Sequence, residues 1–152
     1  MADDGGVSQD GSAGGKITPP GGVVGRNYEN WSPALKAEFK ANTANYQVGG
    51  KLLSETDRLK VWEIRLKPGE RLPAHKHVLD YFWTVMTDGE SEQHTDDGTT
   101  RRVSYTAGNT RHYTFGPDQY LMHDLNNVGT TDLIFLTVEH KRMPGDPGPR
   151  QT

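Results

Sequence analysis

Short stretches of strand-forming residues, each followed by turn residues, recur along most of this 152-residue chain. Pairs such as Pro68-Gly69, Asp88-Gly89 and Asp97-Gly98 mark turns, and β-branched and aromatic residues lie between them. Short strands at such close, fairly even spacing are typical of a β-sandwich or β-barrel. The expected strands are Lys51–Ser54, Leu59–Leu66, Leu72–His77, Tyr81–Met86, Ser91–His94, Arg101–Tyr105, His112–Phe115, Tyr120–Leu125 and Asp132–His140. The sequence therefore predicts an all-β domain.

One short helix is expected before these strands, in the segment NWSPALKAEFKAN. Ser32 can cap its first turn, Pro33 suits the first helical position, and Leu35 and Phe39 lie four residues apart on one face.

The composition of the two ends differs from that of the middle. Residues 1–26 are rich in glycine and polar residues, and residues 143–152 are rich in proline and glycine. Such segments bury too little apolar surface to offset the entropy lost on ordering. We therefore expect disordered tails at 1–26 and 143–152 and one domain over residues 27–142.

Charge and composition exclude several classes of function. The net charge is −3, without a cluster of Lys and Arg, so nucleic acid and anionic membranes are not expected as partners. No apolar run approaches the ~20 residues that span a bilayer, and no secretory signal is recognisable. These features favour a cytoplasmic protein. Cysteine is absent, so a metal would need ligands other than thiolates.

A His-x-His sequence follows the Pro68-Gly69 turn and leads into an aromatic strand. Side chains at i and i+2 of a strand lie on the same face, so His75 and His77 can approach one metal ion. His123, in the segment HDLNN, is a third candidate ligand.

These residues resemble the sequence motifs of the cupins. Gly69, five residues, His75-Lys76-His77 and an aromatic strand ending at Gly89 look like the first cupin motif. His123 and the segment after it look like the end of the second. The resemblance covers Leu59 to Glu139 and implies a double-stranded β-helix (jelly-roll) barrel with one short N-terminal helix. It also implies a metal ion bound inside the barrel, here by His75, His77 and His123.

The first motif departs from the cupin pattern at its glutamate. That position falls on Tyr81, or on Phe82 if the motif is one residue longer, and no Glu occurs between His77 and Gly89. In the second motif, the usual Pro-x-Gly falls on Asp118 and Tyr120. Two interpretations stay open: a three-histidine metal site, or a cupin that has lost its metal.

A ligand set of three neutral imidazoles leaves the full 2+ charge on the ion, which favours anionic, chelating substrates. Among cupin-like proteins, three-histidine sites resemble those of iron(II) dioxygenases. We therefore expect an iron(II) dioxygenase acting on a small anionic molecule. Zinc, manganese and nickel are alternative metals, since imidazole suits many divalent ions. Two other functions stay open: a redox-neutral lyase or isomerase, and a non-catalytic binding protein.

Tyr81 and His112 are the candidate catalytic side chains. The Tyr81 hydroxyl can orient a substrate or transfer a proton, or the ring can pack with Phe82 and Trp83 in the core. His112 can act as a base beside the metal, as an alternative ligand, or as an ordinary surface residue.

Three arginines, Arg65, Arg71 and Arg111, are candidates for binding a substrate carboxylate, because a guanidinium pairs with it through two hydrogen bonds. Each is equally a candidate surface residue, and Arg65 with Glu63 faces either solvent or a polar cavity. Exposed edge strands and the N-terminal helix also favour a homodimer, as many cupins form.

Overall fold

The computed structural model describes residues 17–143, which fold into ten strands and one helix. Their order along the chain is β1 (Gly22–Gly25), α1 (Pro33–Ala41), β2 (Lys51–Glu55), β3 (Leu59–Leu66), β4 (Arg71–His77), β5 (Tyr81–Val85), β6 (Gly89–His94), β7 (Thr100–Tyr105), β8 (Thr110–Tyr113), β9 (Leu121–Asn127) and β10 (Leu133–His140). No helix in the described part of the chain is long and apolar enough to cross a membrane.

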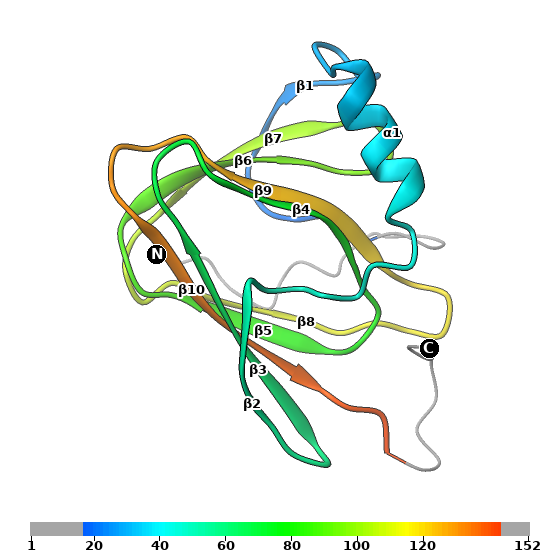
Figure 1. The fold of residues 1–152 in the computed structure, drawn as a ribbon, viewed down its shortest axis with the longest axis vertical. Helices are drawn as coiled ribbons and strands as arrows, with labels where there is room; N and C mark the ends of the chain where they lie inside the picture. The colour runs from blue at the N-terminus through cyan, green and yellow to red at the C-terminus, as the bar shows by residue number, and fades with distance from the viewer. Residues whose placement is uncertain (1–16, 144–152) are drawn as a thin grey trace.

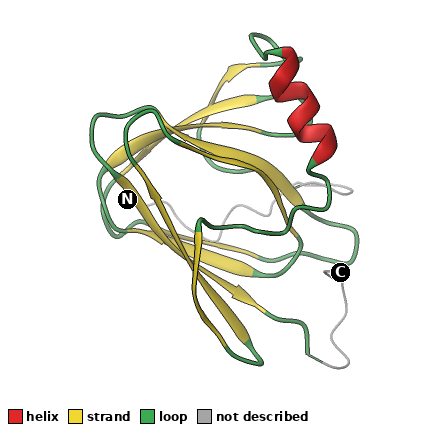
Figure 2. Ribbon diagram, in the orientation of Figure 1, coloured by secondary structure: helices red, strands yellow, loops and turns green. Residues whose placement is uncertain are grey.

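The strands form two five-stranded antiparallel sheets that face each other (Figures 1 and 2). One sheet has the order β1-β7-β6-β9-β4 and the other β2-β3-β10-β5-β8. Neighbours in a sheet are mostly distant in sequence, since β4 pairs with β9 and β3 pairs with β10. This arrangement confirms the predicted all-β fold and brings the two histidine segments onto adjacent strands.

Alternating side chains of β3 show how the core is made. Trp62, Ile64 and Leu66 are each at most 7% exposed and point between the sheets. Arg65 points to solvent and pairs with Glu63, with 3.2 Å between Nη2 and Oε2. The two-residue period of a strand therefore separates core from surface here, and Arg65 faces solvent.

The predicted helix is present, and the cap predicted at Ser32 is confirmed. The Oγ of Ser32 accepts a hydrogen bond from the Leu35 N–H at 3.0 Å, and Pro33 begins the helix. Phe39 is buried and packs with Trp31, Ala74 and Met122. The helix therefore lies on the outer side of the sheet that contains β4 and β9 (Figure 1).

The predicted boundary of the N-terminal tail at residue 26 is too late. Ile17 is 1% exposed and its N–H donates to the Tyr120 carbonyl at 2.7 Å. Gly22–Gly25 pairs with β7. Backbone hydrogen bonds attach β1 to the edge of β7. The glycine-rich composition of this segment does not predict such pairing. The rest of the predicted tails, residues 1–16 and 144–152, lies outside the described residues.

Candidate metal centre

A β-bulge in β4 determines where the two motif-one histidines point. Leu72 lies opposite Leu125 and His75 opposite His123, so three steps along β4 match two along β9. Without the extra residue, Leu72 and His75 would lie on opposite faces of the sheet. The bulge includes Pro73, which has no N–H to contribute to the ladder. The irregular strand therefore directs both an apolar residue and the histidines inward.

Helix α1 and the segment that follows it bind the backbone on the outer side of this bulge. Glu38 Oε2 accepts a hydrogen bond from the Ala74 N–H at 2.9 Å. The amide nitrogens of Asn42 and Asn45 both donate to the Ala74 carbonyl, at 3.0 and 2.9 Å. The helix thus fixes the backbone immediately before His75, and the orientation of that imidazole depends on it.

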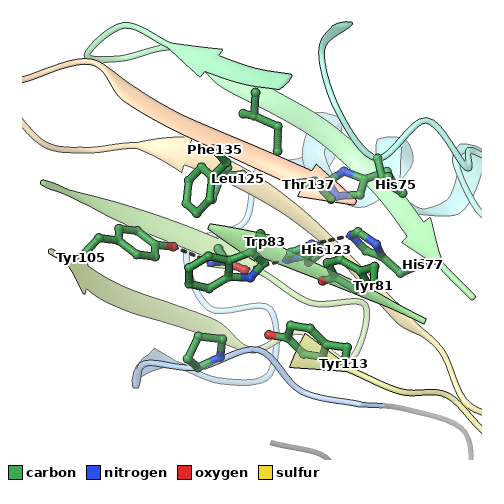
Figure 3. Close-up of a pocket in the computed structure, with 14 residues that line it drawn as sticks. His75, His77, Tyr81, Trp83, Tyr105, Tyr113, His123, Leu125, Phe135 and Thr137 are labelled. Carbon is green, nitrogen blue, oxygen red and sulfur yellow. Dashed lines mark hydrogen bonds between the residues drawn. The ribbon is translucent and has the colours of Figure 1, made fainter. Parts of the chain in front are cut away.

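The three predicted ligands meet between the sheets (Figure 3). One ring nitrogen from each of His75, His77 and His123 lies within 4.8 Å of the others, and the Nε2 atoms of His77 and His123 are 3.2 Å apart. Nitrogen ligands about 2.1 Å from a shared ion are separated by roughly 3.0–3.4 Å. The arrangement therefore suits one divalent ion, with small adjustments of the rings.

Hydrogen bonds assign the tautomers of two of these imidazoles. The Nδ1–H of His75 donates to the Pro73 carbonyl at 2.8 Å, and the Nδ1–H of His123 donates to Gln93 Oε1 at 2.6 Å. In each ring Nε2 then carries the lone pair that a metal would bind, and in His123 it faces His77 Nε2 at 3.2 Å. The Nδ1 of His77 is buried and has no hydrogen-bond partner among the described residues.

Burial keeps all three imidazoles neutral. It lowers the pKa of His75 to about 4 and the pKa values of His77 and His123 to well below the usual range. Mutual repulsion of the charged forms lowers the pKa of His77 further. Neutral imidazole is the form that binds a metal, so the donor set fits a divalent cation.

Tyr81 lies beside the histidines, at the position where the motif expects glutamate. Its ring stacks on that of His77, with 4.0 Å between centroids, and also on that of Tyr113, at 4.8 Å. Burial raises the pKa of Tyr81 well above its usual value, so the phenol keeps its proton. Tyr81 thus lines the cavity and belongs to an aromatic stack, although with Tyr113 rather than with Phe82.

The histidines form one end of a cavity of about 400 Å³, counting all space between atoms and the opening to solvent. Aromatic and aliphatic side chains make most of its wall (Figure 3). The lining residues that the figure labels are His75, His77, Tyr81, Trp83, Tyr105, Tyr113, His123, Leu125, Phe135 and Thr137. Such a wall excludes water and strengthens electrostatic interactions inside.

Gln93 is a site residue that sequence analysis missed. Besides accepting from His123, it donates through Nε2 to the hydroxyl of Tyr105 at 3.2 Å and to Ser91 Oγ at 3.4 Å. Ser91 and Tyr105 also bond to each other at 2.8 Å. The sequence contained one indication of this role. Ser91 and Gln93 lie two residues apart in a predicted strand, which places two polar side chains on one face.

The remaining predicted site residues lie apart from the histidines. His112 is exposed on β8, on the face opposite Tyr113, and its ring lies 5.1 Å from that of Phe82. Arg65 faces solvent. Arg71 pairs with Glu38 on α1 and with Asp124, at 2.8 and 2.9 Å. Arg111 lies on the inward face of β8, next to the cavity rather than in its wall.

The chain is similar to solved structures of cupins. A cupin domain from Bordetella pertussis Tohama I matches with 27% sequence identity and a TM-score of 0.54, over 60% of this chain and 91% of that one. An RmlC-like cupin family protein with a double-stranded β-helix fold, from Methanocaldococcus jannaschii, matches with 22% identity and a TM-score of 0.46, over 59% and 76%. An uncharacterized conserved protein with a double-stranded β-helix domain, from Klebsiella pneumoniae subsp. pneumoniae, matches with 25% identity and a TM-score of 0.47, over 69% and 87%. No protein-family model and no curated protein matches the sequence.

Proposed function

We propose that this protein, a cupin by its fold, is an enzyme that binds one divalent metal ion and acts on a small anionic substrate. One observation carries the proposal: neutral imidazoles from β4 and β9 present ring nitrogens within 4.8 Å of one another inside the fold. The ligands are His75, His77 and His123. A carboxylate does not join this group among residues 17–143.

The reaction we propose is that of an iron(II) dioxygenase. Iron(II) held by three imidazoles supplies redox chemistry with dioxygen and open positions for a chelating anion. The absence of a carboxylate ligand preserves the attraction of the site for an anion. The apolar wall formed by Trp83, Leu125 and Phe135 limits access of water to the bound substrate.

Two side chains of the cavity have separate tasks in this proposal. Tyr81 keeps its proton and can therefore donate a hydrogen bond to a substrate anion held near His77. Gln93 orients His123 through a hydrogen bond to Nδ1.

The protonated Tyr81 also favours a second candidate, a redox-neutral lyase or isomerase using zinc, manganese or nickel. In that reaction, the Tyr81 hydroxyl would donate a hydrogen bond to the oxyanion that develops on the substrate, and a metal held by the three histidines would act only as a Lewis acid. The two candidates differ in whether dioxygen is consumed and in which metal supports turnover.

The experiment that tests the proposal combines elemental analysis with an oxygen-electrode screen. Protein purified without added metal is analysed for iron, zinc, manganese and nickel. It is then screened with β-dicarbonyls, thiols and catechol-type acids, with the His75→Ala protein as control. Iron near one ion per chain and oxygen uptake that requires His75 support the dioxygenase. Turnover at the full rate without oxygen rules it out and supports the redox-neutral enzyme. Tight anion binding without turnover, whatever the metal, leaves only a binding function.

A further inference from the structure

A second pocket adjoins the metal cavity on the side of β7 and β8. The two share Pro20, Trp83 and Tyr105 in their walls. In Figure 3, Trp83 and Tyr105 follow one another along the cavity, away from the histidines. The second pocket has a volume of about 720 Å³, counting the space open to solvent. These side chains therefore form a wall between the two cavities, and a ligand that spans both has to pass Trp83 and Tyr105.

Arg111 places a guanidinium in this second pocket. It lies opposite Trp83 in the pairing of β5 with β8, and on the same face of β8 as Tyr113. Its Cζ lies 5.7 Å from the Tyr113 ring centroid. The Nε atom is buried and has no hydrogen-bond partner within residues 17–143. A buried donor without an acceptor is unfavourable, and an anion in the second pocket would satisfy it after a small movement of the Arg111 side chain.

Arg111 is the cationic side chain that faces the second pocket from the interior, and no acidic side chain is among the lining residues. Arg102 is a lining residue too, but its side chain lies on the outer face of β7, because it alternates with the buried Val103. Arg102 lies near Glu90 and Glu92, at 3.6 and 3.9 Å. By contrast, no ion pair joins Arg111 to an acidic residue in the described part of the chain.

Arg101 is a second inward-facing arginine, on β7, but it is not among the lining residues of either cavity. It lies opposite Gln93 in the pairing of β6 with β7, so it shares the interior face with the side chain that bonds His123. Its Nη1 is buried and has no partner among residues 17–143. Burial lowers the pKa of Arg101, and the charge of Asp97 opposes this change.

The field of Arg111 reaches the metal cavity. Burial raises the pKa of Tyr113 to about 12, and the charge and hydrogen bond of Arg111 oppose that rise. The same charge opposes the effect of burial at Tyr81 and Tyr105, which both line the cavity. Because Arg111 lies 5.7 Å from the ring of Tyr113, which lines the metal cavity, an anion held by Arg111 would lie next to that cavity.

We propose that Arg111 binds a second anionic group of the substrate, a carboxylate or a phosphate. The inference rests on the proposed function and narrows the substrate class to a small molecule with two anionic ends. One end chelates the metal near the histidines, and the other passes Trp83 and Tyr105 to reach Arg111. A guanidinium suits this role because it donates two parallel hydrogen bonds to either group.

The test uses the metal-free protein, with inorganic phosphate and malonate as separate probes. Nuclear magnetic resonance of the ¹⁵N-labelled arginine side chains follows the Nε–H of Arg111, assigned from its loss in Arg111→Lys. We expect a saturable shift of this signal with at least one probe. Calorimetry should show binding weakened about tenfold or more in Arg111→Gln. Arg111→Lys should weaken it less, because it keeps the charge. Arg65→Gln, at a solvent-facing arginine, should leave it unchanged.

The tighter of the two probes identifies the anionic group. An unmoved Arg111 signal with both probes overturns the proposal, as does binding that persists in Arg111→Gln. Metal uptake, measured separately in the same variants, should not change. A wild-type protein that takes up no metal would therefore refute the proposed function, while anion binding at Arg111 would still be tested on its own.

Discussion

The Nε2 atoms of His77 and His123 lie 3.2 Å apart, although 46 positions separate the two residues in sequence. The pairing of β4 with β9 places His75 directly opposite His123, and the bulge at Pro73 and Ala74 turns both motif-one histidines toward this point. This convergence of neutral imidazoles is the observation on which the proposed metal site rests.

Removing any one ligand should abolish tight metal binding. In His75→Ala, His77→Ala and His123→Ala, bound metal should fall from about one ion per chain to about a tenth or less, because two imidazoles hold a divalent ion weakly. Elemental analysis after dialysis measures this. His112→Ala is the matched control, since that ring is exposed on the outer face of β8, and it should bind metal as the wild type does. Equal occupancy in all four variants would place the metal elsewhere.

Gln93→Leu should weaken metal binding by about 10–100-fold, because it leaves the Nδ1–H of His123 without an acceptor. Gln93→Glu keeps an acceptor at the same position and should retain or increase the affinity. Titration with zinc in competition with a chelator measures both. Equal affinities for the two variants would show that Gln93 does not orient His123.

Tyr81→Phe keeps the stacking on His77 and removes only the hydroxyl. Affinity of the zinc-loaded protein for a chelating anion such as oxalate should fall by about tenfold, the effect of one hydrogen bond to a charged group. Metal content should be unchanged. An oxalate affinity equal to that of the wild type would leave Tyr81 with a packing role alone. Turnover of the enzyme's own substrate that slows about 100-fold or more, with metal content unchanged, would show that the Tyr81 hydroxyl stabilises charge that develops during the reaction.

Stability at low pH should depend on Glu38. Its hydrogen bonds to Arg71 lower its pKa below 4.5, against the opposing effect of burial. The unfolded chain therefore takes up this proton first as the pH falls. The contribution of Glu38 is present above pH 4.5 and is lost as the pH falls through the folded-state value. Since the pair is partly solvent-screened, Glu38→Gln should lower the free energy of unfolding at pH 7 by about 1 kcal/mol.

Urea unfolding at a series of pH values measures that difference. The wild type and Glu38→Gln should converge as the pH falls below 4.5. Glu55→Gln serves as the control, because Glu55 pairs with Lys141 away from the bulge. A Glu38→Gln difference that stays constant down to low pH would contradict the assignment.

The sequence predicted the features that depend on local pattern. Strand β3 has the predicted bounds, Leu59–Leu66, and the cap at Ser32 begins the helix as expected. The two-residue period of a strand predicted that His75 and His77 lie on one face. The resemblance to the second cupin motif predicted His123 as the third ligand. These features are encoded by residues close together in sequence.

Features that depend on register between distant strands were not predictable in the same way. The bulge in β4 is visible only once Leu72 and His75 are matched to their partners on β9. The bond between Gln93 and His123 requires β6 to lie beside β9, and the position of Arg111 requires β8 to lie beside β5. Nor does the sequence show that His112 faces outward, because the register of β8 sets its face.

The most direct test of the metal centre is a crystal structure of the zinc-loaded protein, with anomalous diffraction data at the zinc edge. We predict one strong anomalous peak between the sheets, about 2.0–2.1 Å from an imidazole nitrogen of each of His75, His77 and His123. A peak bound by fewer than these three histidines, or no peak in the cavity at full zinc saturation, would contradict the account.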